Sequence, residues 1–152
     1  MNPVIWTRGD YQISTDPAVI DLELVHRYLA EESYWAAGVP RAVVEKSIAH
    51  SLCFSVRHHA GQVGFARLIT DRATFAYLAD VFILTEHRGH GLGKWLVECI
   101  KAHPELPGLR RWLLATADAH GLYTQFGFTV LAKPQNMLEI RNAEVYQKGS
   151  PV

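Results

Sequence analysis

A long apolar run, Phe75–Leu84, is the sequence feature that most restricts how this chain can fold. Asp80 is its only charged residue, and such a run is typical of a strand buried on both faces of a sheet. A glycine-rich stretch follows at residues 85–93, and the next segment, Lys94–His103, carries apolar residues at helical spacing. A central strand that leads through a glycine turn into an amphipathic helix predicts an α/β domain.

The rest of the chain supplies more strands and helices around this unit. Before the apolar run, we expect a strand at 11–15, helices at 16–31 and from Pro40 onward, and strands at 52–59 and 62–70. After the amphipathic helix, we expect a strand at 109–115, a helix at 118–125, a strand at 128–131 and a further candidate strand at 137–141. Three consecutive strands favour antiparallel pairing, and the two later helices are crossovers between strands that could be parallel. The pattern predicts a mixed sheet with helices on both faces.

Composition limits the class of protein. The chain has 152 residues, of which 49% are hydrophobic and 20% are charged, so it is too apolar to be disordered. Its length suits a single domain, which we place at residues 1–145, and its polar end at 146–152 resembles a loose tail. Lys plus Arg and Asp plus Glu both number 15, and this balance argues against nucleic acid as a partner.

Cysteines and histidines suggest neither disulfides nor metal. Cys53 and Cys99 lie in apolar runs, as buried free thiols do. Because His58 and His59 are adjacent in an expected strand, their side chains should point in opposite directions, and the other histidines are dispersed, so we expect no metal site. The chain start is not like a signal peptide and no apolar window is long enough to span a membrane. We expect a cytoplasmic protein without a membrane partner.

The segment Arg88–Lys94 concentrates the candidate chemistry. Its three glycines let backbone N–H groups approach an anion, and the following helix start adds unpaired donors and the positive end of the helix dipole. The spacing does not match the P-loop, because Trp95 stands where Ser or Thr is required, nor does it match the dinucleotide fingerprint, because Lys94 stands where the third glycine is required. An anion site is one interpretation, and a turn shaped only for packing is the other.

Two motifs resemble those of the GNAT acetyltransferase superfamily. Arg88, Gly91 and Gly93 form the pattern Arg-x-x-Gly-x-Gly of its acetyl-coenzyme A loop. Downstream, Leu122–Phe128 resembles its second signature, a Leu-Tyr pair followed by Phe-Gly-Phe, and Ala119 also matches. The resemblance implies a largely antiparallel central sheet with a splayed parallel strand pair, and acetyl-coenzyme A as acetyl donor. One departure is Thr116, where the superfamily often has Asn.

The resemblance also implies which residues would bind the donor. The main chain of Val81, Phe82 and Ile83 would contact pantetheine, and one N–H would polarise the thioester carbonyl, as in an oxyanion hole. The pyrophosphate would lie on the loop, and the residues assigned to the donor site there and on the later helix are Arg88, Gly89, His90, Gly91, Leu92, Gly93, Lys94 and Ala119.

Tyr123 would protonate the departing coenzyme A thiolate. A phenol with a pKa near 10 can donate to a thiolate within hydrogen-bond reach. A packing role on a short helix is the alternative. Asp80 is the leading candidate for the base that deprotonates the acceptor amine, since a charge inside a buried strand needs a reason. A structural salt bridge at Asp80, with a water chain as base, is the other interpretation.

The acceptor would bind between the first helices, their connector and the late strands. Tyr34 and Trp35 in the connector are candidates to stack on a substrate or surround an ammonium group, unless they belong to the core. Glu31 and Glu32 could attract a cationic amine or simply be solvated.

These expectations describe an N-acetyltransferase that transfers the acetyl group of acetyl-coenzyme A to a primary amine of a small molecule or peptide by direct attack. An acyl-coenzyme A sensor of the same fold and a structural subunit are the alternatives. A homodimer is compatible with the fold.

Overall fold

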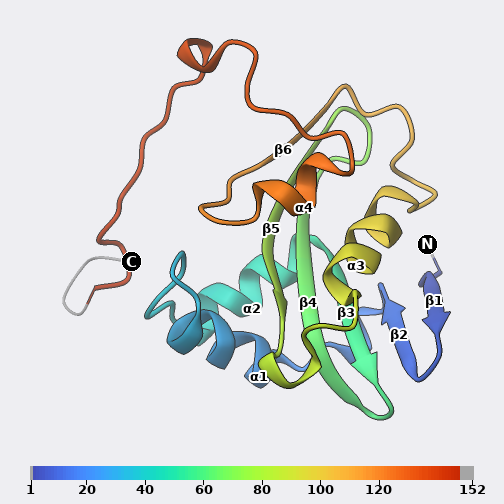
Figure 1. Cartoon of the computed structure of the whole chain (residues 1–152). Helices are drawn as coiled ribbons and strands as arrows, with labels where there is room; N and C mark the ends of the chain where they lie inside the picture. The colour runs from blue at the N-terminus through green and yellow to red at the C-terminus, as the bar shows by residue number, and fades with distance from the viewer. Residues whose placement is uncertain (1, 148–152) are drawn as a thin grey trace.

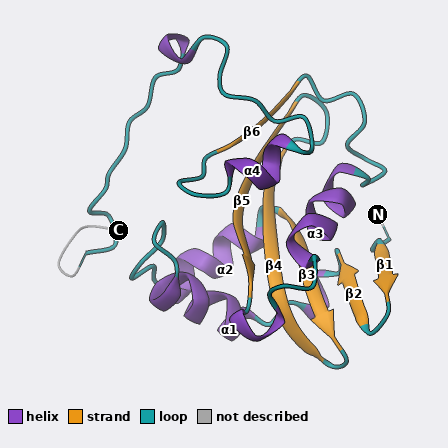
Figure 2. Ribbon diagram, in the orientation of Figure 1, coloured by secondary structure: helices purple, strands orange, loops and turns teal. Residues whose placement is uncertain are grey.

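The computed structural model describes residues 2–147, which build one mixed sheet with helices packed on it (Figures 1 and 2). The six strands are β1 (Ile5–Arg8), β2 (Tyr11–Ser14), β3 (Leu52–His58), β4 (Gly61–Thr70), β5 (Phe75–Ile83) and β6 (Arg111–Leu114). Their order in the sheet is the order in the chain. Neighbours from β1 to β5 pair antiparallel, and β5 and β6 pair in parallel. The predicted mixed, largely antiparallel sheet is confirmed.

The helices lie where the apolar spacing and capping residues predict them. They are α1 (Leu22–Arg27), α2 (Arg41–Ala49), α3 (Leu92–Lys101) and α4 (His120–Thr124), and α1 continues into a π-helical turn at Tyr28–Glu32. Short 3₁₀ turns occupy Pro17–Val19, Thr85–His87 and Pro134–Asn136. The side chain of Asp21 accepts a hydrogen bond from Leu24 N and so caps α1.

Helices on both faces of the sheet bury two separate hydrophobic cores. On one face, α3 packs Leu96 and Ile100 against Phe54 of β3 and its neighbours. On the other face, α1 and α2 cover a second core that includes Phe65 of β4 and Phe82 of β5. The central strands therefore have both faces buried, which is why β5 reads as an almost continuous apolar run.

Two expected strands do not form, and one strand is present that the sequence did not predict. The structure contains a strand, β1, that the sequence analysis did not predict, because only four residues pair there and their alternation is weak. Residues 128–131 and 137–141, both expected as strands, have no strand pairing in the structure. A strand requires a neighbouring ladder, and Val130 and Ile140 instead project into solvent, 80% and 105% exposed. The predicted late strands of the acceptor site therefore do not form in this structure.

The expected tail at 146–152 lies mostly outside the described residues. Its first residue, Tyr146, packs against the core beneath α1 and α2. Within residues 2–147, no helix is long and apolar enough to cross a membrane.

Candidate active site

The parallel strands β5 and β6 separate after a short paired stretch. Phe75–Leu78 pairs with Arg111–Leu114, and within the described chain β5 then continues through Ala79–Ile83 without a partner on that side. A cleft of about 860 Å³ opens along this free edge. Its walls are β5, the glycine-rich loop, the end of β6 and α4. The predicted splayed strand pair is thus present, and it leaves a row of backbone groups facing the cleft.

A β-bulge decides which way the residues of β5 point. Asp80 has a φ of +54°, and the pairing with β4 shifts register at this position. Before the bulge, Ala76 and Leu78 belong to the core beneath α3; after it, Ile83 belongs to that core, so the alternation has shifted by one residue. Without the bulge, Asp80 would point toward the core beneath α3. The bulge turns its carboxylate to the opposite face of the sheet.

Gly64 on β4 makes room for this bulged strand. A Cβ at Gly64 would lie 2.7 Å from Ile83 Cδ1 and 2.9 Å from the Phe82 carbonyl oxygen. Only glycine therefore lets β4 approach β5 closely at this point.

The carboxylate of Asp80 is fully engaged. Arg67 Nε donates to Oδ2 at 2.7 Å, and Trp35 Nε1 donates to Oδ1 at 2.9 Å. The side chains of Arg67 and Asp80 are only 17% and 9% exposed. This geometry supports the ion-pair interpretation of Asp80. Sequence reasoning missed Arg67, although a lone arginine within the apolar strand Gly61–Thr70 signals a buried partner.

The glycine-rich loop forms an open cradle at the end of β5. Gly89 and Gly91 adopt left-handed conformations, with φ of +84° and +73°, and a Cβ at either position would have no atom within 4 Å. Gly91 also begins α3, and no side chain of the described chain caps this helix. Its first N–H groups and the positive end of its dipole therefore face the cleft mouth. This arrangement can hold a phosphate group.

Arg88 shapes the loop rather than extending from it. Its Nε donates to the Ile83 carbonyl at 2.9 Å, and its Nη2 donates to the Tyr28 hydroxyl at 3.1 Å. Tyr28 in turn stacks on Phe82, with ring centroids 3.9 Å apart. The arginine of the motif thus ties the loop to the end of β5 and to the π-helical turn.

Tyr123 on α4 lies across the cleft from β5. Its side chain is 8% exposed and packs edge-to-face on Phe128, with centroids 5.9 Å apart. Burial, assisted by the neighbouring Tyr34 and Asp118, raises the pKa of Tyr123 to about 12. The phenol therefore keeps its proton throughout the neutral pH range. Thr116, which stands where the superfamily often has Asn, accepts a hydrogen bond from Ala119 N and so holds the start of α4.

The connector after α1 bridges the two walls of the cleft. The Tyr34 hydroxyl accepts a hydrogen bond from Ala117 N at 3.0 Å, between β6 and α4. Trp35 packs edge-to-face on Tyr34, with centroids 5.0 Å apart, and reaches Asp80 on β5. Both aromatics stay substantially exposed, 61% and 42%, so they belong to the cleft surface and not to the core. Glu32 also lines this end.

The cleft gathers most of the residues that the sequence predicts for the site. These are Tyr34, Trp35, Asp80, Val81, Phe82, Ile83, Arg88, Gly89, Gly91, Leu92, Gly93, Ala119 and Tyr123. Two do not line it: Lys94 is exposed on α3, and His90 lies against Tyr11 of β2.

The argument that His58 and His59 point apart was wrong. β3 ends at His58, and His59 has a φ of +55°, so the turn brings the two rings to 4.1 Å between centroids. One ligand atom from each histidine and from Asp10 lie within 4.8 Å of one another. Burial and the neighbouring histidines lower the pKa of His58. Asp10 and His59 are exposed, and the absence of a metal site stays a prediction.

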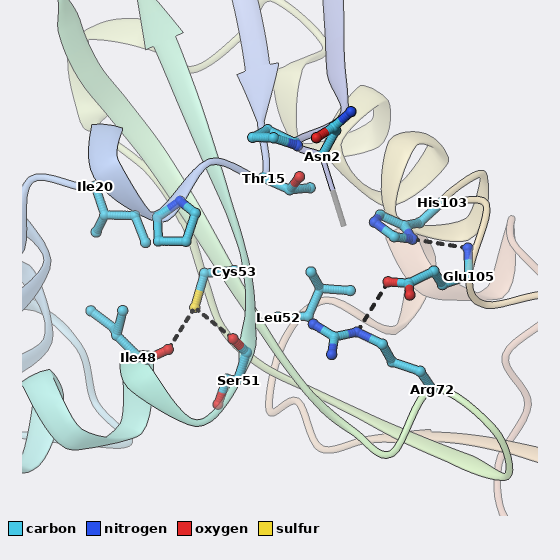
Figure 3. A pocket seen from close by; sticks show the side chains of 12 residues that line it. Asn2, Thr15, Ile20, Ile48, Ser51, Leu52, Cys53, Arg72, His103 and Glu105 are labelled. Atoms are coloured by element: carbon cyan, nitrogen blue, oxygen red, sulfur yellow. Dashed lines mark hydrogen bonds and ion pairs between the residues drawn. The ribbon is translucent and has the colours of Figure 1, made fainter.

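A second, smaller pocket of about 230 Å³ lies away from the cleft, between the start of β3 and the end of α3 (Figure 3). Cys53 donates to the carbonyls of Ile48 and Ser51 there, and burial raises its thiol pKa to about 12. An inert thiol and the ion pair of Arg72 with Glu105 are part of its wall. It contains none of the predicted site residues.

Comparison with known proteins agrees with this geometry. Residues 49–130 match the family model of the acetyltransferase (GNAT) domain. A Gibberella zeae protein named provisionally as an acetyltransferase is 36% identical over 141 residues, with 80% of each chain covered.

Solved structures give the same result. A Xanthomonas campestris protein, provisionally an acetyltransferase of the GNAT family, is 49% identical with a TM-score of 0.88, covering 90% of this chain and 96% of its own. A Clostridium acetobutylicum protein, named as a predicted acetyltransferase and crystallised with acetyl-coenzyme A, shares the fold alone, at 13% identity and a TM-score of 0.60, covering 86% of this chain and 94% of its own. The family match spans over half of the chain, and the chain therefore belongs to the GNAT acetyltransferase family.

Proposed function

We propose that this protein transfers the acetyl group of acetyl-coenzyme A to a primary amine. The observation that carries the proposal is the free edge of β5, which runs from the glycine cradle at Gly89 and Gly91 to a pocket faced by Tyr123. A long donor with phosphates at one end and a reactive thioester at the other fits such a path.

The chain's own groups have separable tasks along this path. The cradle and the start of α3 hold phosphate, and Arg88 keeps the loop against Ile83. Main-chain groups of Val81–Ile83 that face the cleft and have no strand partner on that side bond the pantetheine amides, and one N–H there donates to the carbonyl oxygen of the thioester as negative charge develops on it. Acetyl-coenzyme A supplies the activated acetyl group.

Tyr123 acts as the proton donor. The amine nitrogen forms a bond to the acetyl carbon as the carbon–sulfur bond breaks, and the phenol protonates the sulfur. A phenol whose pKa is about 12 is fully protonated at neutral pH and is therefore always in the donating form.

The acceptor end is aromatic and negatively charged. Tyr34 and Trp35 provide exposed rings, and the Glu32 carboxylate lines the same end. This chemistry favours a cationic amine, which must lose its proton before attack. Because Asp80 is paired with Arg67 and Trp35, we propose that it positions Trp35 and that water accepts the amine proton.

The test combines calorimetric titration with acetyl-coenzyme A and a thiol-release assay on a panel of primary amines. We expect binding, and turnover with at least one cationic amine. Gly91→Glu should abolish binding, because it fills the cradle and repels phosphate. Gly108→Glu is the matched control: its φ is +87° and its surroundings are equally open, yet it does not line the cleft. Equal binding by both variants would remove the loop from the site. Tight binding without turnover on any amine would favour the sensor.

A further inference from the structure

Two neighbouring turns of the sheet bring three metal-binding side chains together. β1 to β4 pair antiparallel in chain order, so the β1–β2 turn and the β3–β4 turn lie at the same end of the sheet (Figure 1). Tyr11 at the start of β2 pairs with His58 at the end of β3. The next residues outward, Asp10 and His59, therefore meet between the two turns. We call Asp10, His58 and His59 the turn cluster.

The backbone at His59 directs its ring back toward His58. Its φ of +55° is uncommon for a residue other than glycine, and it places the two ring centroids 4.1 Å apart. One ligand atom from each residue of the turn cluster lies within 4.8 Å of the others. Ligand atoms bound to one zinc ion, with bonds of about 2.0–2.2 Å, are roughly 3.3–3.6 Å apart. Because Asp10 and His59 are exposed, rotations of their side chains can cover this difference.

The donor atoms of the turn cluster suit a divalent transition metal ion. Two imidazoles and one carboxylate are ligands that zinc and other first-row ions bind, whereas Mg²⁺ and Ca²⁺ prefer sites built from oxygen. Within residues 2–147, no hydrogen bond or ion pair engages these three side chains. The adjacent His87 differs, because a hydrogen bond of 2.9 Å joins its Nδ1 to the Tyr11 hydroxyl. The three ligands are thus available, and their neighbour is not.

We propose that Asp10, His58 and His59 bind one divalent transition metal ion of the zinc class, with water completing its coordination. The expectation of no metal site assumed that the two histidine rings point apart, and their contact removes that assumption. The ion ties the β1–β2 turn to the β3–β4 turn. Because it binds the folded chain, it stabilises the fold. None of the three ligands lines the cleft, so the proposal is independent of the proposed acetyl transfer.

Calorimetric titration of the untagged protein with zinc chloride at pH 7.5 tests the site, without donor or acceptor. We expect one ion per chain with a low-micromolar Kd. Loss of a group that only supports a ligand weakens metal binding by about 10–100-fold, so Asp10→Asn and His59→Gln should each weaken it by about 100-fold. Both residues are exposed, so both variants should fold, which circular dichroism checks.

The matched control is His50→Gln. His50 is an exposed histidine at the end of α2, outside the turn cluster, and this variant should bind zinc as the wild type does. Magnesium chloride should give no binding heat. The proposal is overturned by the absence of saturable zinc binding, by unchanged affinity in either cluster variant, or by magnesium binding as tightly as zinc.

Ring nitrogen chemical shifts identify the ligands in the wild-type chain. In a ¹⁵N-labelled sample, zinc should shift the ring signals of two histidines, because metal binding changes the electronic state of the coordinating nitrogen. The signals missing from His58→Gln and His59→Gln assign these two residues. Shifts at His58 and His59 support the site. Shifts confined to other histidines overturn it.

Discussion

The sheet up to β5 and the chain after α4 are organised in opposite ways. From β2 to β4, each strand pairs with a neighbour on both sides, and Ile13, Phe54 and Phe65 on these strands are all 0% exposed. After α4, residues 128–131 and 137–141 have the composition of strands but not the pairing, and Leu138 is 95% exposed. The difference teaches that apolar residues at strand spacing are not sufficient; a strand also needs an edge to pair with and a face to cover.

If this comparison is right, truncation in the first region should be far more costly than in the second. Phe54→Ala removes a fully buried ring from the core beneath α3, and we expect it to lower the free energy of unfolding by about 3–5 kcal/mol. Urea unfolding followed by circular dichroism measures this. A loss below about 1 kcal/mol would mean that this core repacks and is not tightly organised.

Breaking the ion pair at the bulge should have the next largest effect. Arg67→Met leaves the nearly buried Asp80 carboxylate without its cation, and we expect a loss of about 3 kcal/mol. Arg41→Met is the control, because Arg41 pairs with Glu23 on the exposed surface, where an ion pair adds little to stability. The double variant Arg67→Met with Asp80→Asn should recover part of the loss. Similar losses for Arg67→Met and Arg41→Met would contradict the structural role of the buried pair.

Tyr123 lies where the two regions meet, since it lines the cleft and packs against Phe128 in the chain after α4. Tyr123→Phe should lower kcat about 100-fold while leaving the affinity for acetyl-coenzyme A within a factor of about two. Because the phenol pKa is about 12, its ionisation should produce no inflection in the wild-type rate profile between pH 6 and pH 10. Steady-state kinetics with calorimetry tests both statements. An unchanged kcat would assign Tyr123 to packing against Phe128.

A smaller effect should appear as a dependence of stability on pH. His103, at the end of α3, is 1% exposed, and burial lowers its pKa below the ordinary value of 6.5. The unfolded chain therefore binds a proton at this position more readily than the native chain. The contribution of His103 to the free energy of unfolding is fully present above about pH 6.5, and it declines as the pH falls from there to the lowered pKa.

Urea unfolding at pH 7.5 and pH 5.5 measures this decline. His103→Gln should reduce the difference between the two pH values, whereas the exposed residue His50 offers a control, His50→Gln, that should not. An equal difference in all three proteins would show that other groups cause the decline.

The smallest effect is expected in the segment 137–141. Ile140→Ala should change the free energy of unfolding by less than about 0.5 kcal/mol, because the side chain is fully exposed to solvent. Urea unfolding of the variant beside the wild type measures this. A large effect would show that Ile140 is buried, and the comparison between the two regions would fail.

Much of this molecule could be predicted from local pattern. Apart from β1, the element order through α4 follows from spacings within about ten residues, as do the buried central strand, the glycine loop and the position of Tyr123. Periodicity and turn chemistry act over that range. The same range carries the motif of Arg88, Gly91 and Gly93, which is why the family could be identified before any contact was known.

What only the tertiary structure decided depends on partners far apart in the chain. Next to the bulge at Asp80, Gly64 lets β4 approach Phe82 and Ile83 closely. The Asp80 carboxylate contacts Arg67 and Trp35 only after β4, β5 and the connector have packed. The loop arginine bonds to Tyr28, sixty positions earlier. The late strands predicted at 128–131 and 137–141 have no such partner in the part of the chain that the structure describes. Alternation of apolar and polar residues shows that a segment is able to form a strand. Whether the strand forms also depends on a second strand to pair with and an apolar surface to cover, and the sequence of the segment alone does not contain either.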